Sequence, residues 1–465
     1  MEKRASEALQ QLASLPTVSL AASAPGFENV KGFLARFGYL KTPDADSQES
    51  ARAFASELSP DLDETTSLAL VRYQAMHALP LSGAFDEATR EMMTRGRCGF
   101  PDVDPSSQVA FTITCAWARD ALTYAFGAGT DDIGGEEERQ AVRRAFATWS
   151  AAVQIAFREI GTGDSPDIRI AWTNANCGDT DMTGTVIAHA DYPPGCGFYG
   201  NALPRPLHFD DQENTWCIGM VAGQLDVETV ALHEIGHLLG LAHSSIASAV
   251  MFPTIGANAT NRALSPDDIE GIRRIYPIRG PVFVRHSGRC LDIEGISTAN
   301  GADATQWEYW GGQNQIFRIE WVEASHYRLI AQHSGRVIDV DAFSTANGAQ
   351  IHQWDWWGGD NQKFRLDPAG HGYYRVTAKH SGRSLDVAAA SPNNGAKVVQ
   401  WDWWAGGNQQ WRLGPASVVS RHSGRSLDIE AVSIANGARL TQWDYWGGGN
   451  RGSVSTPLAT VITGS

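Results

Sequence analysis

Three histidines, a glutamate and a glycine near the middle of this chain follow the spacing His-Glu-x-x-His-x-x-Gly-x-x-His, from His233 to His243. On a helix, residues four apart lie on one face, so His233 and His237 can hold one metal ion together. Gly240 lets the helix end and the backbone turn, which brings His243 round as a third nitrogen ligand. Three histidines leave a fourth position open for water, as in a catalytic zinc site. Glu234 lies beside the first ligand and can reach that water.

This spacing resembles the metzincin signature, and Ser244 directly after the third histidine resembles the matrixin branch. Met251 resembles the Met-turn beneath the metal, and residues 264–276 are similar to the closing helix of matrix metalloproteinase catalytic domains. The resemblance covers residues 27–277. It implies a zinc-dependent endopeptidase in which Glu234 is the general base and Met251 shapes the floor of the site without binding metal.

The length and charge of the chain restrict the classes of protein to consider. A chain of 465 residues is too long for one core, so we expect two to four domains. A net charge of −15 argues against nucleic acid or an anionic membrane as the main partner, and no apolar run is long enough to span a bilayer. Residues 5–20 do not form a convincing signal peptide, although the resemblance implies a secreted, extracellular protein. A segment upstream or another export route would reconcile the two.

The N-terminal part is expected to be a small helical domain at residues 27–95, after a tail at residues 1–26. Apolar residues recur at helical spacing in residues 30–40 and 65–77, and Asp86 is the expected cap of a further helix. This pattern resembles the peptidoglycan-binding-like fold of matrixin propeptides. A genuine cell-wall-binding module is the competing interpretation, because fold alone does not separate the two.

The activation segment at residues 96–107 contains Arg-Cys-Gly-Phe-Pro-Asp, which resembles the matrixin cysteine switch, with glycine before it where proline is usual. A thiolate is a strong zinc ligand, so Cys98 can occupy the position that water needs. Tethering raises its effective concentration to the order of millimolar, which keeps the site closed even at modest affinity. The resemblance implies that Arg97 and Asp102 pair and hold the loop. The alternative is a buried or disulfide-bonded Cys98.

The protease domain is expected at residues 108–277. Its patterns predict a strand at 122–126, an amphipathic helix at 136–153 and a further strand at 167–172. This order matches the order of elements before the metal loops in matrixins.

Two further metal sites follow from the resemblance. A Cys-Gly-Asp sequence stands where the family has the His-Gly-Asp of a structural zinc site, and two histidines fall on the other ligands. A mixed structural zinc site would consist of Cys177, Asp179, His189 and His208. Asp210 and Glu213 match calcium ligands of the family, and carboxylates in a loop suit calcium. The alternative for this pair is a solvated acidic turn.

A disulfide is the competing interpretation for the structural zinc site. Cys177 and Cys196 can form a bond that replaces the metal. Cys115 and Cys217 would then be the second pair, in an oxidising compartment.

After residue 277 the chain becomes repetitive. His-Ser-Gly-Arg recurs four times, and each copy continues through an aspartate, an Asn-Gly or Asn-Asn-Gly turn and a Gln-Trp pair. The first three copies close with Asn-Gln-x-Phe or Asn-Gln-x-Trp. They resemble ricin-type repeats, so we expect an all-β ricin-type β-trefoil of three full repeats at residues 278–413. A partial fourth repeat follows at 414–450, and a tail at 451–465.

Sugar recognition needs a flat aromatic face and a carboxylate or amide for paired hydroxyl groups. The resemblance implies one carbohydrate-binding pocket per copy, each made of an aspartate, a tryptophan and an asparagine. The three pockets would be Asp292, Trp307 and Asn314; Asp339, Trp354 and Asn361; and Asp386, Trp401 and Asn408. The alternative is that these residues only hold the trefoil together.

The sequence therefore predicts a multidomain protein with a small all-α prodomain, an α+β metzincin zinc protease domain and an all-β lectin. The expected function is a zinc endopeptidase, made as a latent zymogen, that hydrolyses extracellular proteins and is targeted by its lectin repeats. The expected cofactors are Zn²⁺ and Ca²⁺. The expected partners are protein or peptide substrates and carbohydrate or glycoprotein, with cell wall as a further candidate. The alternative is a glycan-binding or adhesion protein with a silent protease fold, against which the intact Glu234 argues.

Overall fold

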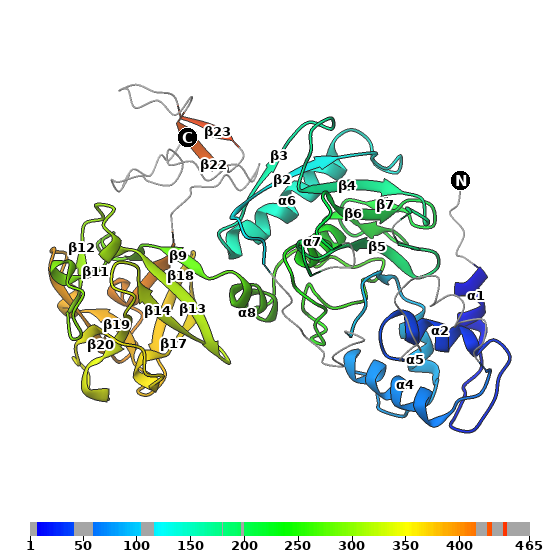
Figure 1. The fold of residues 1–465 in the computed structure, drawn as a ribbon, viewed down its shortest axis with the longest axis horizontal. Helices are drawn as coiled ribbons and strands as arrows, with labels where there is room; N and C mark the ends of the chain where they lie inside the picture. The colour runs from blue at the N-terminus through cyan, green and yellow to red at the C-terminus, as the bar shows by residue number, and fades with distance from the viewer. Residues whose placement is uncertain are drawn as a thin grey trace. The chain divides into compact units, whose positions relative to one another are not determined.

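The computed structural model describes residues 7–40, 59–103, 116–178, 180–196, 200–414, 426–429 and 440–443. The chain divides into two units, residues 1–275 and residues 276–465 (Figure 1). Within the described residues, no helix combines the length and the apolar character needed to cross a membrane.

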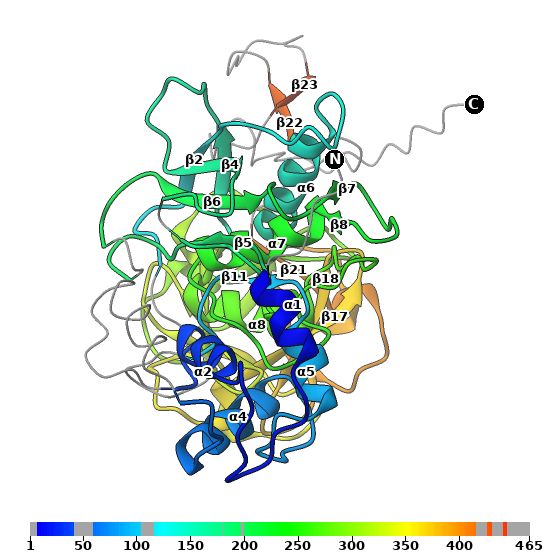
Figure 2. The same cartoon turned by 90° about the vertical axis from the view of Figure 1, so that its right-hand side faces the viewer.

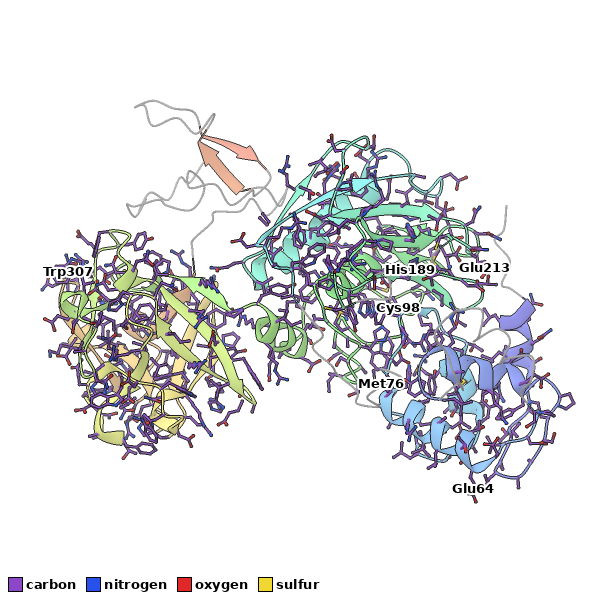
Figure 3. All side chains as sticks on the ribbon, viewed as in Figure 1. Glu64, Met76, Cys98, His189, Glu213 and Trp307 are labelled. Carbon is purple, nitrogen blue, oxygen red and sulfur yellow. The ribbon has the colours of Figure 1, made fainter. Side chains whose placement is uncertain are left out.

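The first unit begins with short helices around an aromatic core. The helices are α1 (Glu7–Ser14), α2 (Glu28–Arg36), α4 (Glu64–Met76) and α5 (Glu87–Met93). Figure 3 labels Glu64 and Met76, the two ends of α4. Asp86 caps α5 by accepting a hydrogen bond from the Thr89 amide at 2.9 Å, which confirms the predicted cap. Buried side chains of this helical part and Met182 and Val186 of the protease part belong to one hydrophobic core.

The protease part is built on a six-stranded sheet in the order β1-β5-β6-β4-β2-β3. Its strands are β1 (Arg97–Cys98), β2 (Ala121–Phe126), β3 (Ala156–Glu159), β4 (Ile168–Thr173), β5 (Val186–Ala190) and β6 (Arg205–Asp210). A small second sheet pairs β7 (Trp216–Cys217) with β8 (Leu225–Asp226). The two-residue strand β1 belongs to the activation segment and pairs in parallel with β5, so this segment forms one edge of the described sheet.

Three helices complete the protease part, namely α6 (Glu137–Ala152), α7 (Val227–Leu238) and α8 (Pro266–Ile275). α6 and α7 pack together, and the Trp149 indole donates a hydrogen bond to the Leu232 carbonyl at 2.8 Å. α7 also lies beside β5 (Figure 2). The predicted helix at 136–153 and the predicted strands at 122–126 and 167–172 are confirmed to within one residue, because their apolar spacing is strong.

The second unit is a β-structure. A 13-stranded sheet contains β9 (Ile278–Gly280), β10 (Val282–Val284), β11 (Cys290–Ile293), β12 (Ala304–Trp307), β13 (Phe317–Glu323), β14 (His326–Ala331), β15 (Val337–Val340), β16 (Ile351–Trp354), β17 (Phe364–Gly370), β18 (Tyr373–Ala378), β19 (Ser384–Val387), β20 (Ala396–Trp401) and β21 (Gln410–Leu413). Short 3₁₀ helices lie between them at η1 (Glu294–Ile296), η2 (Gln313–Gln315), η3 (Asp341–Phe343), η4 (Asp360–Gln362), η5 (Ala388–Ala390) and η6 (Gly407–Gln409).

The His-Ser-Gly-Arg motif joins neighbouring copies of the repeat. In the first three copies the histidine Nε2 lies within hydrogen-bond distance of a serine carbonyl in another copy. The pairs are His286 with Ser391 at 2.9 Å, His333 with Ser297 at 2.8 Å and His380 with Ser344 at 2.8 Å. These contacts run from copy one to copy three, from two to one and from three to two, and β10 pairs with β21. Copies one to three are therefore joined in a ring.

The fourth copy is described only at β22 (Ser426–Ile429) and β23 (Leu440–Trp443). Ser426 pairs with Trp443, the same register that joins Cys290 to Trp307 in the first copy. The rest of this copy and the tail lie outside the described residues, so the predicted partial fourth repeat stays a prediction.

Candidate active site

Helix α7 carries the first two histidines and the glutamate on a fully buried segment. Asp226 begins the helix by accepting hydrogen bonds from the Thr229 amide at 3.1 Å and the Thr229 hydroxyl at 2.7 Å. The helix ends before Gly240, whose φ of +97° is the left-handed conformation that glycine adopts without strain. A side chain at Gly236 would overlap the sulfur of Met251, so this methionine packs directly against the helix. The predicted turn at Gly240 is thereby confirmed.

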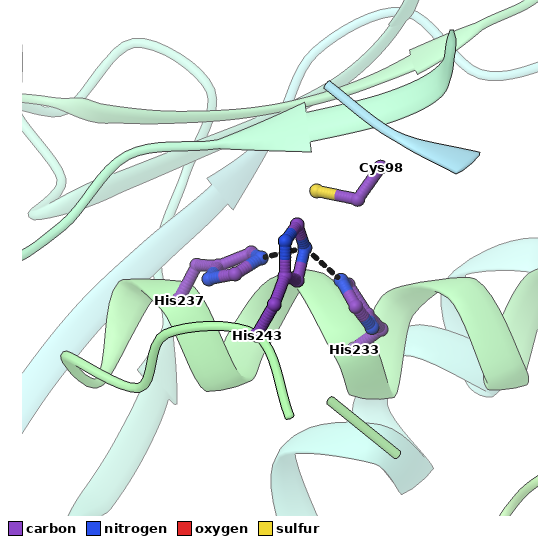
Figure 4. A group of neighbouring side chains, drawn as sticks. All are labelled: Cys98, His233, His237 and His243. Carbon is purple, nitrogen blue, oxygen red and sulfur yellow. Dashed lines mark hydrogen bonds between the residues drawn. The ribbon is translucent and has the colours of Figure 1, made fainter. Parts of the chain in front are cut away.

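The three histidines meet at their Nε2 atoms (Figure 4). His243 Nε2 lies 3.2 Å from His233 Nε2 and 3.1 Å from His237 Nε2. His233 Nδ1 is 2.7 Å from the Val250 carbonyl, and His237 Nδ1 is 2.7 Å from the Leu241 carbonyl. A carbonyl only accepts, so these Nδ1 atoms carry the protons and the Nε2 atoms are left to bind metal.

Burial keeps these imidazoles neutral. It lowers the pKa of His233 to about 3, and it also lowers the pKa values of His237 and His243. Neutral histidine is the form that binds a divalent metal. The donor set therefore fits zinc.

Cys98 lies with the three histidines in one buried cluster. Its sulfur is 3.5 Å from Glu234 Oε2 and accepts the Phe100 amide at 3.3 Å. The Phe100 ring stacks on His237 with ring centroids 4.8 Å apart, so it fills the space beside the ligand. The sequence contained no separate signal for this role of Phe100. The structure thus confirms the prediction that the Cys98 thiol, Glu234 and the three histidine Nε2 atoms lie together.

Burial also shifts the pKa values of the two acids in this cluster. It raises the pKa of Glu234 to about 7 and holds the pKa of the Cys98 thiol well above its usual range. A bound zinc ion favours the thiolate and would lower the pKa of Cys98.

The activation segment is held by a buried ion pair. Arg97 and Asp102 lie 2.5 Å apart, which confirms the pairing that the resemblance implied. The Tyr39 hydroxyl donates to Asp102 Oδ2 at 2.6 Å, and the Arg97 guanidinium lies 3.4 Å from the centre of the Phe37 ring. Burial raises the pKa of Asp102, but the Arg97 charge outweighs it and holds that pKa well below its usual range.

A second cluster with metal-binding groups lies on the neighbouring strands β5 and β6. His189 and His208 are opposite each other in the antiparallel register of these strands, and His208 Nδ1 lies 3.2 Å from His189 Nε2. The Cys177 sulfur is 3.2 Å from the same His189 nitrogen. Three of the four predicted ligands therefore meet, and the fourth, Asp179, lies outside the described residues.

The alternative disulfides are wrong. Cys177 is in the thiol form, with its sulfur 3.2 Å from His189 Nε2, whereas Cys196 is disulfide-bonded and packs against the cluster of Cys98, Phe100 and Tyr192. Cys217 is also a thiol, so it does not pair with Cys115, which lies outside the described residues. Sequence spacing does not determine which sulfurs come within bonding distance.

The predicted calcium ligands hold backbone amides in this structure. Asp210 Oδ1 accepts the amides of Gln212 at 2.9 Å and Glu213 at 3.4 Å, and Glu213 Oε2 accepts the Gly184 amide at 2.7 Å. Burial raises the pKa of Asp210 to about 6. Calcium binding at this pair stays a prediction.

Asp268 contacts two separate segments, of which its place at the start of the closing helix predicts only one. This buried carboxylate accepts the amides of Val250 at 2.9 Å and Met251 at 3.1 Å, and it accepts the Ser265 amide at 2.8 Å at the start of α8. It therefore ties the Met-turn to the closing helix. The sequence placed it near a helix start, but only the fold shows which amides it reaches.

In the second unit, the predicted aspartate and asparagine of each pocket are in contact. The asparagine amide donates to the aspartate at 3.0 Å in copy one, 2.9 Å in copy two and 3.0 Å in copy three. Among the described residues, the Oδ1 atoms of these asparagines have no hydrogen-bond partner. The three pairs are Asn314 with Asp292, Asn361 with Asp339, and Asn408 with Asp386. Each asparagine oxygen is therefore a buried acceptor without a hydrogen-bond partner in the described structure, which is rare in folded proteins.

Two tryptophans of each copy have exposed rings. Trp307, which Figure 3 labels, and its equivalents Trp354 and Trp401 are 40–43% exposed and pack at the Asn-Gly turn of another copy. A second tryptophan in each copy is 56–59% exposed. A side chain on the glycine two residues later would overlap both this ring and the asparagine Oδ1. The second set is Trp310, Trp357 and Trp404, which sequence reasoning missed although the Trp-x-x-Trp spacing recurs in copies two and three.

Comparison with known proteins agrees with this geometry. The matrixin family model matches residues 116–277, and the model of ricin-type beta-trefoil lectin domain-like proteins matches residues 282–354 and 360–443. The hatching enzyme of Paracentrotus lividus is 36% identical over 253 residues, which are 54% of this chain and 38% of that protein. Metalloendoproteinase 1-MMP of Arabidopsis thaliana is 31% identical over 283 residues, which are 56% of this chain and 72% of that protein.

A third relative, matrix metalloproteinase-19 of Homo sapiens, is 32% identical over 255 residues. These residues are 54% of this chain and 46% of that protein. The match thus spans less than half the length of the hatching enzyme and of matrix metalloproteinase-19. The chain belongs to the matrixin family of zinc metalloendopeptidases and carries a ricin-type lectin-like region after its protease domain.

Proposed function

We propose that this protein is a zinc endopeptidase that its own N-terminal segment keeps latent and that its lectin-like region brings to glycans outside the cell. The observation that carries this proposal is the buried cluster of Cys98, Glu234 and three histidine Nε2 atoms. A disulfide at Cys196 suits an oxidising, extracellular compartment. Cell-wall binding by the helical part stays a prediction.

The proposed mechanism uses the side chains of α7. When bound, zinc supplies Lewis-acid chemistry that polarises a peptide carbonyl and lowers the pKa of a water molecule. Glu234 takes the proton from the attacking water and returns it to the leaving amine, because its buried carboxylate lies against the position that the Cys98 thiol occupies in the latent protein. The carbonyls of Val250 and Leu241 orient two of the ligand rings.

Latency follows from what the activation segment occupies. The Cys98 thiol lies against Glu234 and the histidines, where the attacking water is needed. β1 also covers the edge of β5, to which an extended substrate can pair once the segment has left. Cleavage between this segment and β2 would remove both obstacles, because the tether that concentrates the thiol is then cut.

A casein or gelatin assay tests the main proposal. The intact protein should be inactive, the propeptide-cleaved protein active, and a chelator should abolish that activity. A cleaved protein that holds zinc but hydrolyses no protein would instead favour the adhesion protein with a silent protease fold.

We also propose that Cys177, His189 and His208 hold a structural zinc ion. The Cys177 sulfur and His208 Nδ1 each lie 3.2 Å from His189 Nε2. Cys177 is also in the thiol form, which supports a role as a metal ligand. Thiolate and imidazole are preferred zinc ligands.

Replacing Cys177 by serine should lower the zinc content of the purified protein from about two ions per chain to about one, because a serine hydroxyl is a poor zinc ligand. Metal analysis measures this ratio directly. Cys217→Ser is the control, since Cys217 is also a free thiol and belongs to neither cluster. A wild-type protein with a single zinc ion would contradict the structural site.

For the lectin-like region we propose one sugar pocket in each of the first three copies. The contacting asparagine and aspartate present polar groups, and Trp310 and its equivalents present an exposed ring beside the free asparagine Oδ1. This assigns the sugar-stacking ring to the second tryptophan, whereas Trp307 and its equivalents pack at the junction between copies.

Deleting residues 282–465 should leave hydrolysis of a short soluble peptide unchanged but abolish retention on a polysaccharide or glycoprotein matrix. Alanine at Asn314, Asn361 and Asn408 together should abolish retention in the same way with the repeats still present. Elution volumes on a polysaccharide column measure both variants. Equal retention of the truncated and full-length proteins would remove the lectin proposal.

A further inference from the structure

The three histidines differ in what holds their second nitrogen. His233 and His237 direct Nδ1 at backbone carbonyls of the protease part. His243 Nδ1 lies 2.7 Å from a carboxylate oxygen, Oδ1 of Asp102, and both side chains are fully buried. The group that faces the second nitrogen of the third ligand, at ion-pair distance, therefore comes from the activation segment.

The position of this carboxylate is fixed by the N-terminal side of the chain. Arg97 lies 2.5 Å from Asp102 Oδ1, the same oxygen that faces His243, and Tyr39 donates to Oδ2 at 2.6 Å. Tyr39 directly follows α2 and its turn and contacts the other carboxylate oxygen, whereas Arg97 holds the oxygen that faces His243.

The chemical effect of such a contact is known in general. A histidine that binds metal through Nε2 gives its Nδ1 proton to an acceptor, which fixes the ring and increases the basicity of Nε2. A carboxylate is a stronger acceptor than a carbonyl because it is charged. Losing such a partner typically weakens metal binding by about 10- to 100-fold.

We propose that Asp102 is a positioning residue for the catalytic metal in the latent protein, and that it strengthens zinc binding through His243. The inference rests on the proposed zinc site. The activation segment would then stabilise the bound metal in two ways, directly through Cys98 and indirectly through the contact of Asp102 with His243. Both interactions are lost when the activation segment is removed, so the activated enzyme binds its zinc less tightly than the zymogen.

The test uses the full-length chain with Glu234→Ala, which prevents self-cleavage, and Cys177→Ser, which removes the thiol of the second cluster so that zinc affinity and the cobalt band report on the catalytic site. Zinc affinity is measured by competition with a chromogenic chelator. Adding Asp102→Ala should weaken zinc binding by about 10- to 100-fold, and Asp102→Asn should fall between it and the parent because an amide oxygen still accepts. Tyr39→Phe is the matched control, since it removes the other short contact of the same carboxylate without touching His243. Its zinc affinity should stay within about twofold of the parent.

Cobalt substitution separates this role from general loosening of the loop. The thiolate-to-cobalt charge-transfer band reports whether Cys98 still binds the metal. The band should persist in the Asp102→Ala protein while its affinity falls. Unchanged affinity, an equal loss in Tyr39→Phe, or disappearance of the band would each overturn the inference. A parent protein that holds no zinc would instead contradict the proposed function itself.

Discussion

Replacing Glu234 by alanine is expected to abolish peptide-bond hydrolysis while the catalytic zinc content stays at the wild-type level. The glutamate is fully buried, its Oε2 lies 3.5 Å from the Cys98 sulfur, and no part of its proposed role is to bind metal. General acid–base catalysis contributes about 10²- to 10⁴-fold, so turnover should fall by up to about four orders of magnitude. The measurement is kcat on a fluorogenic peptide with the propeptide-cleaved form, alongside metal analysis of the same sample.

Glu234→Gln is the matched variant, because it keeps the size and polarity of the side chain but cannot take a proton. It should be as inactive as the alanine variant. Loss of the metal in either variant, or activity within about tenfold of wild type, would contradict the role of Glu234 as the base.

Replacing Cys98 by serine is expected to give a protein that is active without processing and cleaves itself. The serine hydroxyl is a far weaker zinc ligand than a thiolate, so tethering no longer suffices to occupy the metal. Tethering adds about 10²- to 10⁴-fold to binding, and unprocessed activity should rise by at least about a hundredfold when the thiol is lost. Peptidase activity of freshly purified full-length protein and its fragmentation over time measure the effect.

Two further variants make this test specific. Cys217→Ser removes another buried thiol and should stay as latent as wild type. Cys98→Ser combined with Glu234→Ala should stay intact, which separates self-cleavage from a contaminating protease. If Cys98→Ser alone is as latent as wild type, the thiol is not the inhibitory ligand.

Local patterns predicted the parts of the site that depend on local geometry. Spacing along α7 brings His233 and His237 together, and the left-handed turn at Gly240 follows from the conformational freedom of glycine. Helix and strand positions in the protease part also follow from apolar periodicity.

Local sequence patterns did not predict the contacts between segments that are distant in the sequence. The approach of Asp102 to His243 depends on β1 pairing with β5, which no local spacing encodes. The disulfide hypotheses failed for the same reason, because the direction of the Cys177 sulfur is set by its packing against His189. In the lectin-like region, the sequence predicted the repeat itself. It did not predict that the Trp310 ring lies beside Asn314, because this depends on the backbone around Gly312.

The ring of histidine-to-serine contacts has a consequence for chain connectivity. In each of the first three copies the histidine contacts one neighbouring copy and the serine carbonyl contacts the other. The same contact therefore joins the copies at all three junctions. A chain reopened at the exposed Asn-Gly turn of another copy and rejoined at its old ends would keep every one of these contacts. Three orders of the copies along the chain are thus compatible with the same ring of contacts.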